Sequence, residues 1–228
     1  DAGIAATVWT SPNQVAGQLV NAAQPAFAVT ADGVSHAMWE ADGRLYYSYR
    51  PPEGAWASPK RIASGASPQL AVDAQGQLHA IFANSFQGNY EIYHIRLLAN
   101  YKWSLPIPVS RTSGPSVQPV LVADSTKGLH AAWMDATSGD WLIYVATWVG
   151  DFWSNYAVNN AAGKDPALAV MNNGAVILAW QYAARALDSE GSYDIYVSEH
   201  LDGGWSIPIG RSKAVPCSNW SSRSMSDC

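Results

Sequence analysis

The segment PQLAVDAQGQLHAIFANSFQGNYEIYHIRLLANYKWSLP, residues 68–106, decides the fold of this chain. It contains four short β-rich runs that are separated by Asp, Gly, Asn and other turn residues. We expect strands over Gln69–Val72, Leu78–Phe82, Tyr90–Ile95 and Trp103–Val109. Runs of this length with polar turns between them are typical of an antiparallel meander, in which each strand pairs with the next one.

The same pattern occurs four times along the chain, and each copy begins at a proline: Pro25, Pro68, Pro119 and Pro166. A tryptophan recurs near the end of each copy, with a further one before the first copy: Trp9, Trp56, Trp103, Trp153 and Trp205. A period of about 40–50 residues with four strands per repeat indicates the blades of a β-propeller. Each blade has apolar faces that become buried only when neighbouring blades stack.

We therefore predict an all-β protein with one β-propeller domain over residues 1–210. Its four-stranded antiparallel blades are expected at about residues 25–64, 65–114, 115–162 and 163–210, with a Ser-rich, Cys-containing tail at 211–228. Residues 7–16 resemble the fourth strands of the repeats and predict an extra outer strand. The ring is then completed by further chain, by a partner chain, or by the four blades alone, and the first two are favoured. An open sheet edge predicts self-association or a partner chain.

The composition argues against several classes of function. Only 14% of the residues are charged and the net charge is −5, which disfavours a nucleic-acid partner. No apolar run approaches the roughly 20 residues that span a bilayer, so membrane insertion is not expected. No spacing of Cys and His matches a zinc, haem or redox motif, so we expect neither a metal nor another cofactor.

The two cysteines, Cys217 and Cys228, both lie in the tail. A disulfide between them is expected to contribute roughly 3 kcal/mol in the chain-entropy model, and two free thiols are the alternative. A disulfide implies an oxidising compartment. The start at Asp1 fits either a processed mature protein or an excised segment. We expect a protein that is secreted or lies at the cell surface.

The repeat text, P-x-L-A-V-D-x-x-G-x-L-H-A-x-W and later G-x-W-S-x-P, resembles the sialidase-like superfamily of β-propellers. That superfamily carries an Asp-box, Ser-x-Asp-x-Gly-x-Thr-Trp, between the third and fourth strands. Residues 198–205, SEHLDGGW, match it best, and Ser48–Trp56 keeps its Ser, Gly and Trp. The resemblance covers roughly residues 7–210 and implies a propeller with Asp202 in a structural role. The sialidase set of three Arg, a Tyr with its Glu, and an Asp does not map onto this chain, so no catalytic residue is carried over.

Function is better sought in segments that do not repeat. The loop after the second strand is longest in the fourth copy, where it contains the candidate ligand-binding residues Gln181, Tyr182, Arg185, Asp188 and Glu190. Such loops line one mouth of a propeller channel, and long loops are often functional. Asp188 and Glu190 also supply the two carboxylates that glycoside cleavage requires, although exposed loop carboxylates are usually only solvated.

Two sets of repeated residues invite a functional interpretation. His36, His79 and His130 share one blade position, but Ile177 fills it in the fourth copy, which favours packing over metal binding. A second set opens the third strands, with Leu45 taken as its first member: Leu45, Tyr90, Trp141 and Tyr193. Blade packing is the favoured role for this second set, and a stacking platform for sugar rings or bases is the alternative.

Two functions remain. The first is a secreted, non-catalytic propeller that binds a glycan or protein partner or contributes to a cell-surface assembly. The low charge, the degenerate Asp-boxes and the missing catalytic set favour it. The second is a sialidase-like exo-glycosidase that uses the acidic residues of the long loop.

Overall fold

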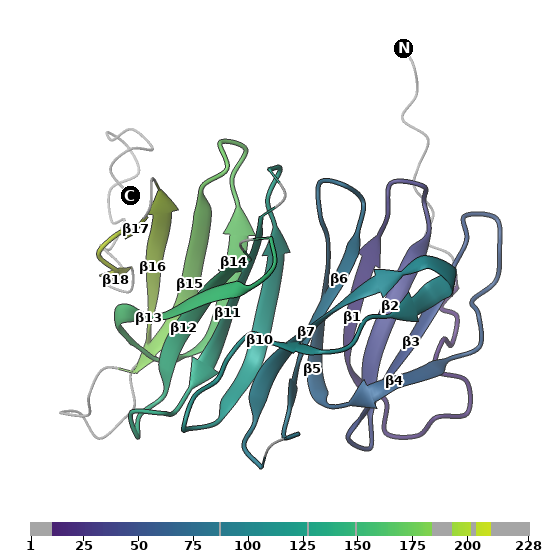
Figure 1. Cartoon of the computed structure of the whole chain (residues 1–228), viewed down its shortest axis with the longest axis horizontal. Coiled ribbons are helices and arrows are strands. Elements are labelled where there is room, and N and C mark those ends of the chain that lie inside the picture. Colours follow the sequence, from purple (N-terminus) through teal and green to yellow (C-terminus); the bar gives the residue numbers. More distant parts are fainter. Residues whose placement is uncertain are drawn as a thin grey trace, which may run out of the picture.

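The structure is a computed structural model that describes residues 11–86, 88–126, 128–148, 150–183, 193–201 and 204–210. Within these residues, all regular elements are strands except a 3-10 turn at Ala99–Tyr101. No helix in this part of the chain is long and apolar enough to cross a membrane. The strands form four antiparallel sheets that follow one another from the first sheet at the right of Figure 1 to the fourth at the left. The predicted all-β propeller of four-stranded antiparallel blades is confirmed.

Each sheet is a meander in which the first four strands are neighbours in chain order. The first sheet contains β1 (Ala23–Val29), β2 (Ser35–Ala41), β3 (Arg44–Arg50) and β4 (Lys60–Ser64). The second contains β5 (Ala66–Val72), β6 (Leu78–Asn84), β7 (Glu91–Leu98), β8 (Lys102–Trp103) and β9 (Ile107–Pro108). The third contains β10 (Ser116–Ala123), β11 (Leu129–Asp135), β12 (Leu142–Trp148) and β13 (Trp153–Ala162). The fourth contains β14 (Lys164–Val170), β15 (Val176–Ala183), β16 (Tyr193–Leu201), β17 (Gly204–Trp205) and β18 (Ile209–Gly210).

The outer strand of the second blade differs from its prediction. A continuous strand over Trp103–Val109 is replaced by β8 and β9, which both pair with β7. Pro106 and Pro108 have no N–H to donate, so the ladder is interrupted between the two pieces. The strand predicted over residues 7–16 lies partly outside the described residues, and residues 11–16 are not in a strand.

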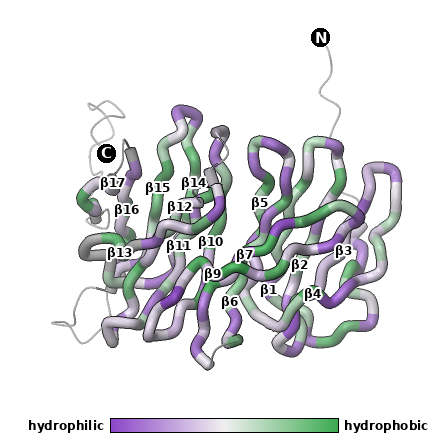
Figure 2. Tube along the Cα trace, viewed as in Figure 1, coloured by the Kyte–Doolittle hydropathy of each residue, from purple (hydrophilic) through white to green (hydrophobic). Residues whose placement is uncertain are grey.

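Three apolar cores hold the blades together, one at each interface between consecutive sheets. The first contains Met38, Leu45, Tyr47, Leu78, Ala80, Phe82, Tyr93 and Ile95. The second contains Ile81, Ala83, Ile92, Val109, Leu121, Leu129, Ala131, Trp133, Ala146 and Trp153. The third contains Ala132, Met134, Ile143, Val145, Val158, Leu178 and Trp180. Many hydrophilic residues lie in the loops at the ends of the strands, as Figure 2 shows.

One aromatic position recurs in the second strand of each blade. Phe82, Trp133 and Trp180 are at most 1% exposed, and each lies in the core shared with the preceding blade. Truncating a buried aromatic side chain of this kind costs about 3–5 kcal/mol. The blades therefore stabilise one another as the repeat predicts.

The first strands of the blades surround one axis. β1 contacts β5, β5 contacts β10, and β10 contacts β14. Residues from all four of these inner strands line a single cavity. Among the described strands, no comparable contact joins the first sheet to the fourth. The four blades thus form an arc around an axis, and among the described strands the first and last blades do not pack together as consecutive blades do.

Candidate functional site at the axial mouth

Each inner strand begins with a corner in which a left-handed residue precedes a proline. The four corners are Gln24-Pro25, Ser67-Pro68, Gln118-Pro119 and Asp165-Pro166, with φ between 51° and 53° at the first residue. A residue before proline normally prefers extended backbone, and a positive φ at a residue other than glycine costs about 1–3 kcal/mol. The pairing register between first and second strands shifts at every corner. Four equal departures from local preference show that the surrounding fold imposes this conformation.

The four corners line an axial cavity of about 310 Å³. Its polar side chains are four groups that both donate and accept hydrogen bonds and one carboxylate: Gln24, Ser67, Gln69, Gln118 and Asp165. Gln24, Gln118 and Asp165 are exposed. The Gln24 Oε1 atom accepts a hydrogen bond of 2.7 Å from the backbone N–H of Ser67, which links the first two blades. The cavity therefore offers both donors and acceptors to a polar ligand.

Aromatic residues that open the third strands lie beside these corners. The carbonyl of Tyr90 accepts a hydrogen bond of 2.7 Å from the N–H of Ser116, and the carbonyl of Trp141 accepts one of 2.9 Å from Gly163. Both donors lie two residues before a corner of the next blade. The side chains of Tyr90 and Trp141 are 47% and 40% exposed. Their exposure favours the stacking-platform interpretation over blade packing.

The first blade has no aromatic residue at this position. Gly43, not Leu45, is the counterpart of Tyr90, because the Gly43 carbonyl accepts the equivalent hydrogen bond, 3.0 Å long, from Gly65. Leu45 is instead fully buried opposite Glu40, in the core between the first and second blades. The prediction that Leu45 opens the third strand of the first blade is therefore wrong by two residues. For the fourth blade, the side chain of Tyr193 lies outside the described part of the chain.

Two of the five predicted ligand-binding residues lie in the described part of the chain. Gln181 pairs with Lys164, immediately before the Asp165 corner. Tyr182 is half-buried, with its ring 4.5 Å from that of Tyr196, and packs against the core between the third and fourth blades. Three predicted ligand residues and the predicted disulfide lie outside the described residues: Arg185, Asp188, Glu190 and the pair Cys217–Cys228.

The four corners lie in repeated segments, so the expectation that functional residues lie in non-repeating loops does not find them. Their signal is nevertheless present in the sequence, because a polar residue precedes the proline that begins each repeat. Nothing local indicates that this residue has a positive φ, since residues before proline are usually extended. The convergence of four such residues on one cavity follows only from the arrangement of the blades.

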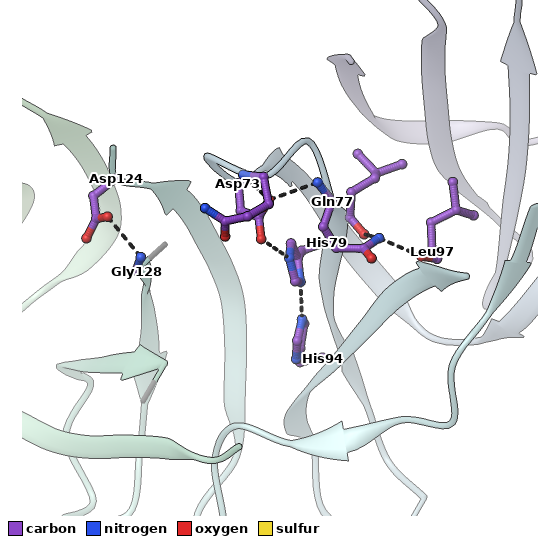
Figure 3. A network of polar contacts seen from close by, with 9 residues as sticks. Asp73, Gln77, His79, His94, Leu97, Asp124 and Gly128 are labelled. Atoms are coloured by element: carbon purple, nitrogen blue, oxygen red, sulfur yellow. Dashed lines mark hydrogen bonds and ion pairs between the residues drawn. The ribbon is translucent and has the colours of Figure 1, made fainter. Parts of the chain in front are cut away.

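At the opposite end of the blades, histidines fasten the first turn, an arrangement here called the turn clip. In the second blade, His79 Nε2 donates to Asp73 Oδ2 at 3.3 Å, and Asp73 Oδ1 accepts from the N–H groups of Gln75 and Gln77 (Figure 3). His94 Nε2 then donates to His79 Nδ1 at 2.9 Å. The carboxylate thus closes the turn and the imidazole holds the carboxylate.

The other blades vary the turn clip, and in the first blade His36 Nε2 lies 3.2 Å from the Thr30 hydroxyl instead of a carboxylate. The third blade keeps it, with His130 Nε2 at 2.9 Å from Asp124 Oδ2. The fourth blade replaces both partners with apolar residues, Met171 and Ile177. Joint replacement of a carboxylate and an imidazole by two apolar residues fits a structural role for the histidines. Within the described residues, no group of three His, Cys, Asp or Glu side chains is arranged to hold a metal ion.

His94 is a neutral imidazole in the core of the arc. It is 1% exposed and lies edge-to-face against Trp148 and Trp153, at ring-centroid distances of 5.1 and 5.4 Å. Burial, followed by the nearby His79 and Arg96, lowers the pKa of His94 to about 3. Its Nδ1 atom has no hydrogen-bond partner within the described residues. A proton added there has no acceptor, which is consistent with the lowered pKa.

A buried acidic pair lies at the junction of the second and third blades. Asp135 Oδ2 and Glu91 Oε2 lie 2.8 and 3.3 Å from the Ser116 hydroxyl. Ser110 donates to Glu91, and the Thr112 N–H and hydroxyl contact Glu91 and Asp135 respectively. Both carboxylates are at most 7% exposed, and neither lines the axial cavity. This pair therefore joins two blades and is closed to a ligand.

No protein-family model matches the sequence, and no curated protein matches it. Solved structures do match the fold. An α-L-arabinanase of Penicillium chrysogenum, complexed with arabinobiose, gives a TM-score of 0.60 at 13% identity, over 79% of this chain and 63% of that chain. An α-L-arabinofuranosidase of Fusarium graminearum, complexed with an iminosugar inhibitor, gives 0.58 at 14% identity, over 83% and 66%. A polysaccharide lyase gives 0.57 at 11% identity, over 81% and 59%.

These likenesses concern the backbone alone. At 11–14% identity they establish a shared fold, and the chain spans 59–66% of the length of these three structures. They fit the propeller architecture that the sialidase-like resemblance implies, without singling out sialidases. The arc of four blades around a polar axial cavity is thus a β-propeller architecture.

Proposed function

We propose that this chain is a carbohydrate-binding propeller that holds a neutral sugar of a polysaccharide at its axial mouth. The observation that carries the proposal is the cavity lined by four polar corners, near the strand starts that carry the exposed residues Tyr90 and Trp141. A polysaccharide partner also fits the predicted secreted or cell-surface location.

The chemistry of the mouth matches a sugar in two respects. Glutamine amides and a serine hydroxyl both donate and accept hydrogen bonds, as sugar hydroxyls require. Exposed Tyr and Trp rings offer flat apolar surfaces beside those polar groups, and binding pockets typically combine aromatic surface with a few oriented polar groups. The polar corners and the strand starts that carry these aromatic residues lie at the same end of the propeller.

The cavity favours a neutral ligand over an anionic one. Among its described lining residues there is no Arg or Lys, and Asp165 is the single carboxylate. An anionic sugar therefore meets a like charge and no fork of positive donors. Sialidases grip the carboxylate of their substrate with three Arg, so the sialidase-like alternative finds no support at this mouth.

The similar solved structures add support at the level of the fold. Two of them contain a sugar or a sugar mimic, arabinobiose in one and an iminosugar inhibitor in the other. Their low identity transfers no residue role to this chain. They favour a carbohydrate as the first ligand class to test.

Glycoside hydrolysis is the second candidate, and Asp165 is the observation that favours it. Hydrolysis generally requires two carboxylates on either side of the scissile bond. Asp165 lines the mouth, and the loop that follows β15 in the same blade contains Asp188 and Glu190. Either one supplies the second carboxylate in this candidate. The buried pair Glu91 and Asp135 is an unsuitable source, because both are enclosed by hydrogen bonds.

Calorimetric titration with arabino-, xylo- and cello-oligosaccharides, and with sialyllactose as the anionic ligand, tests the proposal. Asp165→Ala is expected to weaken neutral-sugar binding about 10- to 100-fold, and Gln118→Ala about two- to tenfold, the ranges for lost hydrogen bonds to charged and to neutral groups. Asn172→Ala, in an exposed turn at the far end of the fourth blade, is the matched control and leaves affinity unchanged. Binding of sialyllactose alone, or corner variants with native affinity, contradicts the proposal.

Catalysis is tested separately by following new reducing ends in the same oligosaccharides. If the second candidate holds, Asp165→Asn abolishes hydrolysis while binding is largely retained, because the amide keeps the size and most of the hydrogen bonds of the carboxylate. Binding without turnover in the native chain rules hydrolysis out for those sugars.

A further inference from the structure

The outward face of the fourth blade exposes an apolar side chain at a position that is buried in the other three blades. Strand register places Ile195 opposite Gln181, in the position that Leu45, Ile92 and Ile143 occupy in the first, second and third blades. Those three residues are 0% exposed, whereas Ile195 is 52% exposed. The same backbone position is therefore a core position in three blades and a surface position in the fourth.

The neighbouring positions on this face behave in the same way. Val197 is half-buried, while its counterparts Tyr47, His94 and Val145 are at most 3% exposed. Ala179, which pairs with Val197, is also half-buried, and its counterparts Met38, Ile81 and Ala132 are fully buried. Ala179, Ile195 and Val197, here called the outward face, form a continuous surface on β15 and β16.

In the first three blades the equivalent face is covered in the same way each time. Each of the three inter-blade cores places the aromatic residue from the second strand of the next blade over it, successively Phe82, Trp133 and Trp180. On the opposite side of the first blade, Phe27 is 58% exposed, but Trp39, the counterpart of Phe82, Trp133 and Trp180, is only 5% exposed. The outward face of the fourth blade thus has the pairing chemistry of the three interfaces already formed.

The inner strands of the first and fourth blades line the same cavity, with Gln24 and Pro25 from one and Asp165 and Pro166 from the other. Each of the three existing interfaces joins one blade to the next through the same kind of apolar core. The partner that repeats this interface at the outward face is therefore one further blade.

We propose that the outward face is a docking surface for one further four-stranded blade of the same repeat, which inserts between the fourth and the first blades. The expected partner presents an aromatic side chain on its second strand to Ile195 and Val197. This inference concerns ring closure and does not depend on sugar binding.

The test is to append a second copy of residues 65–114 after Cys228 of the full chain and to measure amide hydrogen exchange in β16 by mass spectrometry. Exchange over residues 193–201 is expected to slow at least tenfold relative to the unmodified chain. A parallel fusion carries residues 115–162 instead. Unchanged exchange in both fusions overturns the proposal.

Two variants make the test specific. Phe82→Asp in the appended copy, or Ile195→Asp in the parent part, is expected to restore the fast exchange of β16, because each places a charge in the proposed interface. In the unmodified chain, Ile195→Asp is expected to shift the melting temperature far less than Ile143→Asp, its buried counterpart. Protection that survives both variants overturns the proposal. A stable dimer of the unmodified chain with a protected β16 also overturns it, in favour of a second copy as the partner.

Discussion

Removing the His94 imidazole is expected to flatten the dependence of stability on pH. The pKa of His94 is lowered from its ordinary value of 6.5 to about 3 by burial, His79 and Arg96. Below pH 6.5 the unfolded chain therefore binds a proton that the folded chain does not, and the free energy of unfolding falls as pH falls until about pH 3. At pH 5 this group alone is expected to reduce stability by about 2 kcal/mol, whereas at pH 7.5 its effect is close to zero.

The substitution is chosen from the chain itself. Val145 occupies the equivalent position in the third blade, so His94→Val introduces a side chain that the repeat already accepts. At pH 7.5 the variant is expected to lose about 1–2 kcal/mol, because a small cavity forms and His79 Nδ1 loses its donor (Figure 3). At pH 5 that deficit should disappear, because the variant has no imidazole to protonate at this position.

Urea unfolding of both proteins at half-unit steps from pH 7.5 to 5.0 measures the difference directly. Val145→Ala is the control, because it creates a cavity at the equivalent site without a titrating group, and its deficit should be the same at every pH. If the curves for the native chain and His94→Val stay parallel down to pH 5, the assignment of a buried neutral imidazole is wrong.

Three further outcomes follow from other parts of the structure. The double variant Asp124→Met/His130→Ile reproduces the apolar pair of the fourth blade. It should be more stable than Asp124→Met alone, because the single variant leaves the His130 imidazole without its acceptor at a cost of about 1–3 kcal/mol. A double-mutant cycle by urea unfolding measures the coupling energy between the two residues. Gly163→Ala should destabilise the fold by more than about 2 kcal/mol, and Gly174→Ala by about 1 kcal/mol. Both glycines have positive φ, but only a Cβ at position 163 meets a backbone carbonyl, at 2.3 Å. Equal losses of unfolding free energy in the two variants contradict this expectation. Gln118→Gly should raise stability by about 0.5 kcal/mol by relieving its positive φ while weakening sugar binding, which unfolding and titration of one preparation check together.

Most of the fold could be predicted, but the extent of some elements could not. The alternation of apolar and polar residues over Leu78–Phe82 is local, and β6 contains that segment. The sequence predicts one outer strand over Trp103–Val109, because periodicity alone does not show where Pro106 and Pro108 interrupt pairing. The position of Leu45 is ambiguous from the sequence, since a shift of two residues keeps a side chain on the same face of a strand.

The candidate site was predictable only in part. Tyr90 and Trp141 stand out in the sequence, but whether they pack or face solvent depends on the neighbouring blade. Gln118 and Asp165 precede prolines in a way that usually means ordinary extended backbone. Their positive φ is imposed by the register shift at the start of each inner strand, and no residue type at those positions signals it.

The sequence by itself determined the repeating unit: where strands and turns fall, which aromatic residue each blade buries, and that no blade is stable alone. These properties follow from the local alternation of apolar and polar residues and from a period of about 50 residues. Every copy of the repeat has both features, so each blade can pack on its neighbour in the same way. Only the tertiary structure decided that four polar corners meet at one cavity and that Ile195 stays exposed while Ile143 is buried. The physical reason is that the burial of a side chain and the meeting of the corners depend on which blades lie next to one another around the axis. Equivalent positions in the repeats have similar residues, so the sequence at those positions does not indicate which blade has a neighbour.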